Sequence, residues 1–359
     1  MKNNTLTAAL ILGFSLFTLG CGEQEQQTDT TPTPVPPVTD NGIPVIKADS
    51  TYSVLTQYDI TYAEGLTHNT SSTSPVAMPQ LLDVYYPNND STNRPLFMFI
   101  HGGGFKGGTK TKPEIVEMGN YFAARGWVFA SIDYRTAEDL GVIQGMSPEQ
   151  LLNYYQGIAP TEWIEHALQA AQSADEVMQA TAMYTAQRDA KAALRWLVAN
   201  STDYNINTDY ITVGGASAGS ITTIALGISE LEDFRDEISI NDDPTLATAN
   251  TDQSYKVNSM VYFWGSNIKL DVFEGVYGIN RYDSNDPELF MAHGTAEDPV
   301  TPYAEALELQ DIYNDLGVHS TLATLEGYGH GAWHAQVDGK GLFELTFDFL
   351  VERQQLVVE

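Results

Sequence analysis

Two glycine-rich segments contain residues whose types and spacing suit attack on a carbonyl group. The first, Gly215-Ala216-Ser217-Ala218-Gly219, follows a short β-branched run and fits the pattern G-x-S-x-G. Small residues on both sides of Ser217 allow a sharp turn from a strand into a helix, and this turn presents the serine oxygen at the start of the helix. A nucleotide-binding loop or a plain tight turn has a similar composition, so this motif alone leaves the chemistry open.

The second segment is His101-Gly102-Gly103-Gly104-Phe105, which follows the apolar run 96–100. A tetrahedral oxygen with developing negative charge is stabilised by amide N–H groups that no side chain covers, and consecutive glycines supply such groups. The two motifs together predict acyl transfer with Ser217 as the attacking group. A serine needs an imidazole to take its proton and a carboxylate to orient that imidazole.

With these motifs the sequence resembles the α/β-hydrolase superfamily, in particular its carboxylesterases of the hormone-sensitive-lipase and the feruloyl or acetylxylan esterase type. The likeness extends through 123–127, 133–135 and 189–197 and covers most of the chain from about residue 50 to 350. The resemblance implies that Ser217 is the nucleophile and that the amides of Gly103, Gly104 and Ala218 form the oxyanion hole. It also implies that His101 shapes the loop and transfers no proton.

The resemblance places the triad acid in the segment 293–302. In related enzymes a similar turn carries the acid four residues beyond its histidine, and Glu297 holds that position here. Asp298, however, is the residue followed by Pro-Val-Thr-Pro, which indicates one inserted residue. Asp298 is therefore the favoured acid and Glu297 the alternative.

The expected base is His330, in the segment Gly327-Tyr328-Gly329-His330-Gly331 after the last predicted strand. Glycines on both sides give the loop the freedom to bring the imidazole to the serine. His334 is the competing candidate, and an exposed position on a helix is its simpler interpretation.

Short apolar runs alternate with helical periodicity over most of the chain, which predicts an α/β fold with a mostly parallel central sheet and helices on both faces. The leading strands, expected to be antiparallel, are Tyr52–Tyr62 and Gln80–Tyr86. The later strands are expected at Pro95–Ile100, Trp127–Asp133, Tyr210–Val213, Val257–Phe263, Leu289–Ala292 and Thr321–Leu325. Helices are expected at Pro113–Arg125, Ala186–Asn200, Ser217–Leu231, Tyr303–Leu316 and Leu342–Gln354.

Residues 136–185 are longer than a usual connection between a strand and a helix. Apolar residues such as Leu151, Tyr155, Trp163 and Leu168 recur there among polar ones. The pattern predicts a helical, cap-like insertion that covers the catalytic ends of the strands and lines the substrate pocket. A stabilising flap without ligand contact is the alternative.

The composition limits the classes of partner that the protein can bind. With 47 acidic and 17 basic residues the formal net charge is −30, which argues against nucleic acid and anionic lipid surfaces. No zinc-ligand spacing and no phosphate-binding loop motif occurs in the sequence, so no metal and no cofactor are expected. Ser266-Asn267-Ile268-Lys269 fits S-x-x-K, but without the accompanying K-T-G we interpret it as a chance match.

Residues 1–20 have the features of a lipoprotein-type signal peptide, because Lys2 precedes the apolar stretch 6–20. The end of this stretch, Thr18-Leu19-Gly20-Cys21, resembles a bacterial lipobox, which implies lipidation of Cys21; an ordinary cleaved signal is the alternative. Residues 21–45 are rich in Pro, Thr and Gln and predict a disordered tether before a catalytic domain at 46–355. The expected location is the bacterial outer membrane or cell surface, or otherwise the periplasm or the medium, with membrane contact only through the lipid.

These features predict a serine carboxylic-ester hydrolase that forms an acyl-enzyme with short to medium acyl or aryl esters, polysaccharide acetyl and feruloyl esters included. Two alternatives come from other classes. A serine peptidase of the prolyl-oligopeptidase type shares the order of the triad, but H-G-G-G counts against it. A noncatalytic binding module on a hydrolase fold would lack the triad, whose elements all occur in this sequence.

Overall fold

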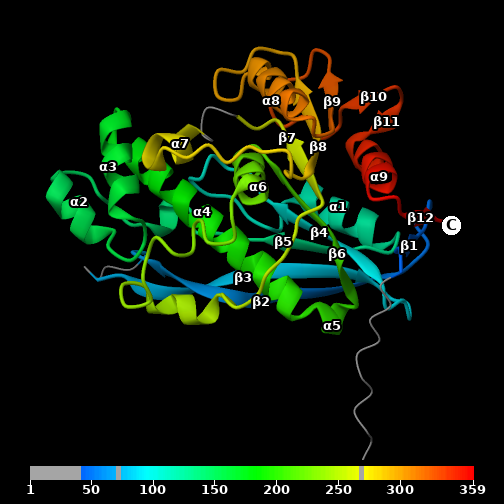
Figure 1. The fold of residues 1–359 in the computed structure, drawn as a ribbon, viewed down its shortest axis with the longest axis horizontal. Helices are drawn as coiled ribbons and strands as arrows, with labels where there is room; N and C mark the ends of the chain where they lie inside the picture. Colours follow the sequence, from blue (N-terminus) through cyan, green and yellow to red (C-terminus); the bar gives the residue numbers. More distant parts are fainter. Residues whose placement is uncertain (1–41, 70–73, 267–270) are drawn as a thin grey trace, which may run out of the picture. The chain divides into compact units, whose positions relative to one another are not determined.

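An eight-stranded mixed sheet is the centre of the fold in a computed structural model that describes residues 42–69, 74–266 and 271–359 (Figure 1). The strand order is β2-β3-β5-β4-β6-β7-β8-β9. The pairs β2–β3 and β3–β5 are antiparallel, and every later pair is parallel. The strands are β2 (Val54–Thr67), β3 (Val76–Pro87), β4 (Arg94–Ile100), β5 (Val128–Ile132), β6 (Ile206–Ala216), β7 (Ser259–Phe263), β8 (Glu288–Gly294) and β9 (Ser320–Leu325). The predicted mostly parallel sheet, with its antiparallel leading strands, is confirmed.

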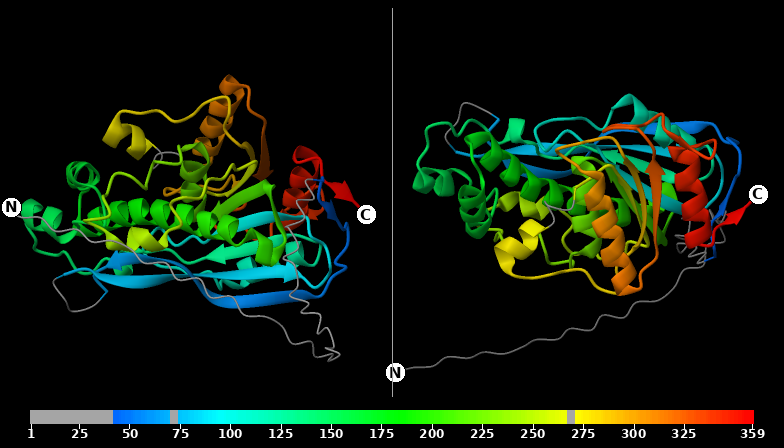
Figure 2. Two further views of the ribbon diagram at one scale, coloured as in Figure 1. Left: turned by 60° about the horizontal axis from the view of Figure 1, so that its bottom comes forward. Right: turned by 90° about the horizontal axis from the view of Figure 1, so that it is seen from above.

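Helices cover both faces of the sheet, as predicted (Figure 2). The alternation of side chains along β4 explains the two layers, since successive residues of a strand point to opposite faces. Leu96 and Met98 lie in the core beneath α4 (Ala174–Ala199), α6 (Ala218–Ile228) and α8 (Tyr303–Leu316). Phe97 and Phe99 lie in the core beneath α1 (Pro113–Ala123) and α9 (Leu342–Arg353). Burial on both faces accounts for the uninterrupted apolar run of this strand.

Helix α4 differs from the prediction, because it begins at Ala174 instead of Ala186. The side chain of Ser173 caps the helix by accepting a hydrogen bond from the amide of Glu176. Most residues of α4 from Thr181 to Arg195 are buried, so the helix lacks the polar face on which periodicity depends.

The stretch 136–185 contains a short 3₁₀ turn, two helices and the first half of α4. The turn is Ala137–Asp139, and the helices are α2 (Pro148–Tyr154) and α3 (Thr161–Ala170). Trp163 of α3 donates a hydrogen bond from Nε1 to the carbonyl oxygen of Ala180 on α4, at 2.7 Å. The insertion is therefore attached to the long helix that crosses the sheet.

Short elements complete the described fold. Strand β1 (Val45–Ile46) pairs in parallel with β12 (Val357–Val358), so the first and last strands are joined. The remaining elements are α5 (Ser201–Tyr204), a 3₁₀ turn at Pro244–Thr248, α7 (Asp271–Tyr277), β10 (Gln336–Val337) and β11 (Lys340–Gly341). The predicted signal peptide, Cys21 and most of the predicted tether lie outside the described residues.

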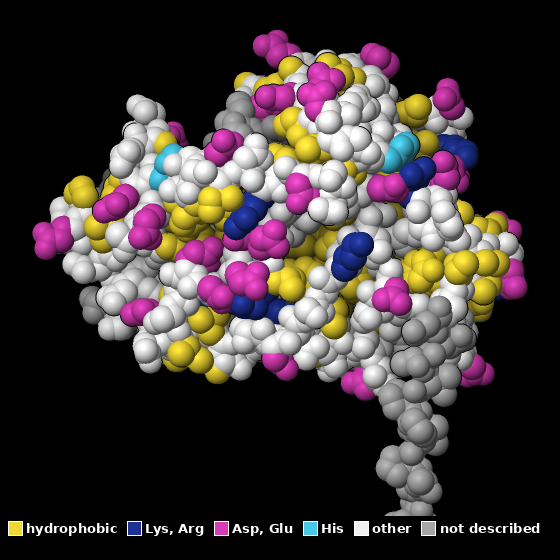
Figure 3. Space-filling view, viewed as in Figure 1, with side chains coloured by type: hydrophobic (Ala, Val, Ile, Leu, Met, Phe, Trp, Pro, Cys, Tyr) yellow, Lys and Arg dark blue, Asp and Glu magenta, His cyan; other side chains and the backbone are white. Residues whose placement is uncertain are grey.

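The surface agrees with the acidic composition. On the face drawn in Figure 3, Asp and Glu side chains outnumber those of Lys and Arg. In the described part of the chain, no helix combines the length and the apolar character needed to span a bilayer.

Candidate active site

Ser217 lies at a sharp turn between β6, which ends at Ala216, and α6, which begins at Ala218. Its φ of 57° is in the left-handed region, which costs free energy for a residue other than glycine. Gly219 must be small, because a Cβ atom there would lie 2.0 Å from the carbonyl oxygen of Ile100. The backbone N–H of Ser217 donates to the carbonyl oxygen of Phe263 at 2.8 Å, which fixes the turn to the neighbouring strand.

The structure brings Ser217 together with two of the residues named from the sequence. His330 Nε2 lies 2.9 Å from Ser217 Oγ, and His330 Nδ1 lies 3.0 Å from Asp298 Oδ2. A proton on Nδ1, donated to Asp298, leaves Nε2 free to accept the hydroxyl proton of the serine. Glu297, the alternative acid, has an exposed side chain. The three residues follow β6, β8 and β9, at the carboxyl ends of parallel strands where open α/β sheets bind ligands.

Thr301 is a site residue that the sequence analysis missed. Its side chain is buried, and Oγ1 donates to Asp298 Oδ2 at 2.7 Å while lying 2.9 Å from His330 Nδ1. The backbone amides of Val300 and Thr301 donate to Asp298 Oδ1 at 2.9 and 3.2 Å. Burial raises the pKa of Asp298, but these hydrogen bonds outweigh burial and the pKa is lowered overall. An Asp followed three residues later by Thr in a Pro-containing turn is the signal that could have indicated this contact.

The glycine segment after β4 adopts backbone conformations that favour glycine. Gly103 and Gly104 have φ values of 135° and 62°, and a Cβ atom on Gly103 would lie 1.9 Å from the carbonyl oxygen of Gly107. Ala218 is the first residue of α6, and an amide in the first turn of a helix has no carbonyl partner within that helix. The three amides named from the sequence therefore belong to the loop and the helix start that flank Ser217.

His101 contributes to the shape of this loop. Its ring is buried and stacked on Tyr134, with centroids 4.3 Å apart, and Nδ1 donates to the carbonyl oxygen of Gly102 at 2.7 Å. Burial lowers the pKa of His101 to about 4, so the ring is neutral at neutral pH. A buried neutral imidazole that donates to its own loop fits the structural role expected from the sequence.

Gln179 is a second residue that the sequence analysis missed. It lies on α4, and its Nε2 donates to the carbonyl oxygen of Gly104 at 2.6 Å. This hydrogen bond connects the insertion with the glycine loop across 75 residues of sequence. No local sequence pattern signals such a contact, because it depends on where α4 packs.

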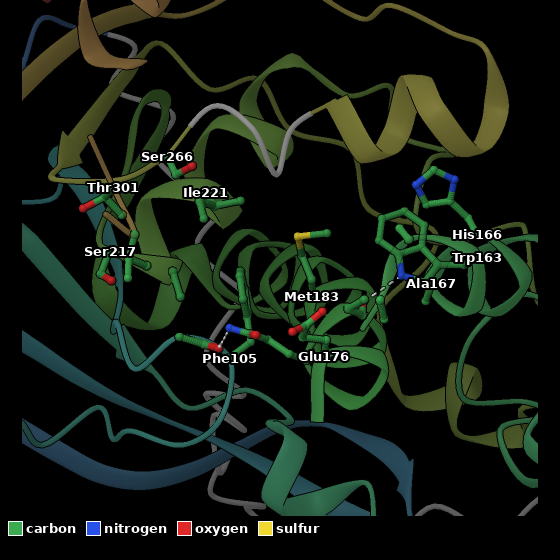
Figure 4. A pocket seen from close by; sticks show the side chains of 17 residues that line it. Phe105, Trp163, His166, Ala167, Glu176, Met183, Ser217, Ile221, Ser266 and Thr301 are labelled. Atoms are coloured by element: carbon green, nitrogen blue, oxygen red, sulfur yellow. Dashed lines mark hydrogen bonds between the residues drawn. The ribbon is translucent and has the colours of Figure 1, made fainter. Parts of the chain in front are cut away.

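Ser217 faces two cavities. The first, here called the α3–α4 cavity, has a volume of about 190 Å³. Figure 4 shows Ser217 at one end of it, Trp163 at the other and Met183 between them. The second, here called the His330 cavity, has a volume of about 630 Å³. The lining of the α3–α4 cavity includes Phe105, Trp163, Ala167, Met183 and Ile221. The lining of the His330 cavity includes Lys112, Trp264, Asp298, His330 and Trp333.

The other candidates take no part in this chemistry, although Ser266 lines the α3–α4 cavity. Ser266 is buried and its hydroxyl is hydrogen-bonded to the carboxylate of Glu305. His334 lines a separate cavity with Glu114 and Glu117. Among residues 42–69, 74–266 and 271–359, no group of three His, Cys, Asp or Glu side chains is arranged to hold a metal ion.

Comparisons with known proteins define the class. The chain is similar in structure to a truncated form of a carbohydrate esterase from gut microbiota, with a TM-score of 0.52 and 18% identity over 86% of this chain and 99% of that one. It is also similar to a thermophilic esterase of the Planctomycetes species Thermogutta terrifontis with bound butyrate, with a TM-score of 0.53 and 18% identity over 81% and 94% of the two chains. No curated protein matches the chain in sequence.

The fold is that of the α/β-hydrolases, as the sequence predicts. The BD-FAE family model matches residues 82–146 and 170–271. Together with the α/β-hydrolase fold that the esterase neighbours share, this match supports an α/β-hydrolase of the carboxylesterase type. Residues 147–169, which include α2 and nearly all of α3, lie outside both matched segments.

Proposed function

We propose that the protein hydrolyses carboxylic esters through an acyl-enzyme on Ser217, with His330 as the proton acceptor and Asp298 as the residue that orients it. The observation that carries this proposal is the distance of 2.9 Å between His330 Nε2 and Ser217 Oγ. This distance is within the range over which a base takes the proton of its nucleophile.

The mechanism has two acyl-transfer steps. Ser217 Oγ attacks the carbonyl carbon while its proton passes to His330 Nε2, and the carbonyl electron pair moves onto the oxygen. The amides of Gly103, Gly104 and Ala218 donate to that oxyanion. The intermediate then breaks its bond to the alcohol oxygen, which leaves with the proton from Nε2. A water molecule repeats the sequence on the acyl-enzyme, which releases the carboxylic acid and restores Ser217.

The substrate class proposed for this chain is an ester of a short acyl group with a larger alcohol, carbohydrate alcohols included. The similarity to a carbohydrate esterase and to a Thermogutta terrifontis esterase with bound butyrate or propionate supports this class. The H-G-G-G motif favours esters over the peptides of the alternative peptidase class.

Ser217→Ala is expected to lower kcat for a short-chain p-nitrophenyl ester by about 10³-fold or more, because the acyl-enzyme cannot form. A fluorophosphonate probe is expected to label the wild-type protein at Ser217 and to leave the variant unlabelled. The circular dichroism spectrum of the variant, compared with that of the wild type, shows whether the fold is intact. Retained turnover in a folded Ser217→Ala variant would refute the proposal, and an unlabelled wild type would favour the noncatalytic module.

The neighbouring acids provide a matched pair. Asp298→Asn is expected to lower kcat far more than Glu297→Gln, because only Asp298 lies within 3.0 Å of His330 Nδ1. A larger loss of kcat in Glu297→Gln than in Asp298→Asn would instead assign the orienting role to Glu297.

We also propose that the chain is exported and anchored by a lipid on Cys21, its only cysteine. The support is the apolar stretch 6–20 followed by Thr-Leu-Gly-Cys. A tether of about twenty residues before β1 would then separate the catalytic domain from the membrane.

A further inference from the structure

His330, the residue that protonates the departing alcohol, lines one of the two cavities at Ser217 and not the other. His330 lines the larger cavity together with Asp298. The α3–α4 cavity is lined mainly by residues of the glycine loop, α3, α4 and α6, together with Ser266 and residues 300–301. Both cavities include Ser217 and Gly104. A substrate bound at Ser217 can therefore extend into both at once.

The proposed ester hydrolysis decides which part of the substrate enters which cavity. The departing alcohol oxygen takes its proton from His330 Nε2, so it must lie on the side of that nitrogen. The oxyanion must lie against the amides of the glycine loop and Ala218. Only the acyl substituent of the tetrahedral carbon then remains to be placed. Building on the proposed function, we propose that the α3–α4 cavity binds the acyl group and the His330 cavity binds the alcohol, and that Ala167 and Met183 determine acyl specificity.

The walls of the α3–α4 cavity suit an apolar acyl tail. Trp163, Ala167, Met183 and Ile221 line it, and each of these residues is less than 10% exposed. Trp163 is held by its hydrogen bond to Ala180 and by ring contacts with Tyr184 and Phe234, at centroid distances of 5.4 and 6.1 Å. A wall fixed in this way is formed before the substrate binds, which reduces the entropy cost of binding.

The volumes indicate a short acyl group and a larger alcohol. An apolar cavity of about 150 Å³ holds a benzene molecule. The α3–α4 cavity, at about 190 Å³, therefore has room for one ring or for a chain of about six carbon atoms. The His330 cavity is about 630 Å³, and Trp333 in its wall also lines a neighbouring cavity of about 220 Å³. The alcohol side thus accommodates the bulkier part of the ester.

The acyl wall contains structure that the family model does not match. Trp163 and Ala167 lie on α3, within the unmatched residues 147–169. Met183 lies on α4, within the matched segment. The outer end of the acyl cavity is therefore a feature of this chain, and α3 is the element expected to distinguish its acyl preference.

The experiment uses two ester series on the full chain. The first series varies the acyl group on p-nitrophenol from acetate to hexanoate, and the second varies the alcohol of acetate esters from ethanol to 2-naphthol. Ala167→Phe is expected to lower the hexanoate-to-acetate ratio of kcat/KM at least tenfold, because the added ring fills the cavity. Met183→Ala is expected to raise the same ratio at least threefold, because it lengthens the cavity. Neither variant is expected to change the ratios within the alcohol series by more than about twofold.

Val142→Phe is the matched control, because Val142 lies in the same insertion, is 76% exposed and does not line the cavity. It is expected to leave both sets of ratios unchanged. The proposal would be overturned if the hexanoate-to-acetate ratio of kcat/KM stayed constant in Ala167→Phe and Met183→Ala. It would also be overturned if these variants changed the ratios within the alcohol series instead. A wild type that hydrolyses no ester of either series would instead refute the proposed function, so the two failures are distinguishable.

Discussion

The orientation of the His330 ring depends on its contacts with Asp298 and Thr301. His330 Nδ1 has two oxygens beside it, Asp298 Oδ2 at 3.0 Å and Thr301 Oγ1 at 2.9 Å. The Thr301 hydroxyl donates to the same carboxylate oxygen, so its own lone pairs face the histidine. Thr301 thus holds the carboxylate and also limits the orientations open to the imidazole, and we interpret it as a positioning residue.

Thr301→Val is expected to lower kcat about tenfold near pH 8 and by a larger factor near pH 5. A hydrogen bond to a charged group contributes about 1.5–3 kcal/mol, and losing the one from Thr301 raises the pKa of Asp298 from its lowered value. A raised pKa means that a smaller fraction of Asp298 is ionised as the pH falls, so the loss grows toward acidic pH. A pH profile of kcat between pH 4.5 and 8.5, for the variant and the wild type, measures this change.

Thr301→Ser keeps the hydroxyl and is the control for the lost methyl group. It is expected to restore most of the activity and the wild-type pH profile. A serine variant as impaired as the valine variant would show that packing of the methyl group, and not the hydrogen bond, is the contribution of Thr301.

Among the elements, α4 has two roles. Its second half packs on the sheet, where Ala190, Leu194 and Leu197 are fully buried. Its first half holds Gln179 against the glycine loop and Met183 against the acyl cavity. Because one continuous helix joins these positions, the insertion and the oxyanion loop are held in a fixed relation to the core.

Gln179→Leu is expected to lower kcat about tenfold with a smaller change in KM, because the freed Gly104 carbonyl allows the neighbouring amides to turn away from the oxyanion. A change in kcat that is larger than the change in KM distinguishes this positioning role from a role in binding the acyl group. The control is Gln172→Leu, an exposed glutamine just before α4, which is expected to behave like the wild type. An unchanged kcat in Gln179→Leu would contradict the positioning role.

At the scale of the whole molecule, a net charge of −30 leaves the chain without general electrostatic attraction to anionic membranes. Attachment to a membrane therefore requires a separate device, and the proposed lipid on Cys21 would supply it.

Cys21→Ala is expected to move the protein from the membrane fraction to the soluble fraction of a bacterial host, because the lipid acceptor is lost. Esterase activity per molecule is expected to be unchanged, since Cys21 is not part of the site. Immunoblots of the two fractions, normalised to total protein, measure the shift. A wild-type protein found entirely in the soluble fraction would contradict the anchor.

Features that depend on neighbouring residues could be predicted from the amino-acid order: the strands and helices around the sheet, the turn at Ser217 and the glycine loop. The alternation of apolar residues, small residues at a turn and consecutive glycines act through local sterics, so their effect can be predicted without a structure. The folded chain was needed to show which carboxylate lies beside His330, that Thr301 and Gln179 contact the site, and that α3 lines one cavity. Gln179 and Gly104, for example, are 75 residues apart in the sequence, and such partners are chosen by packing, which no local pattern records.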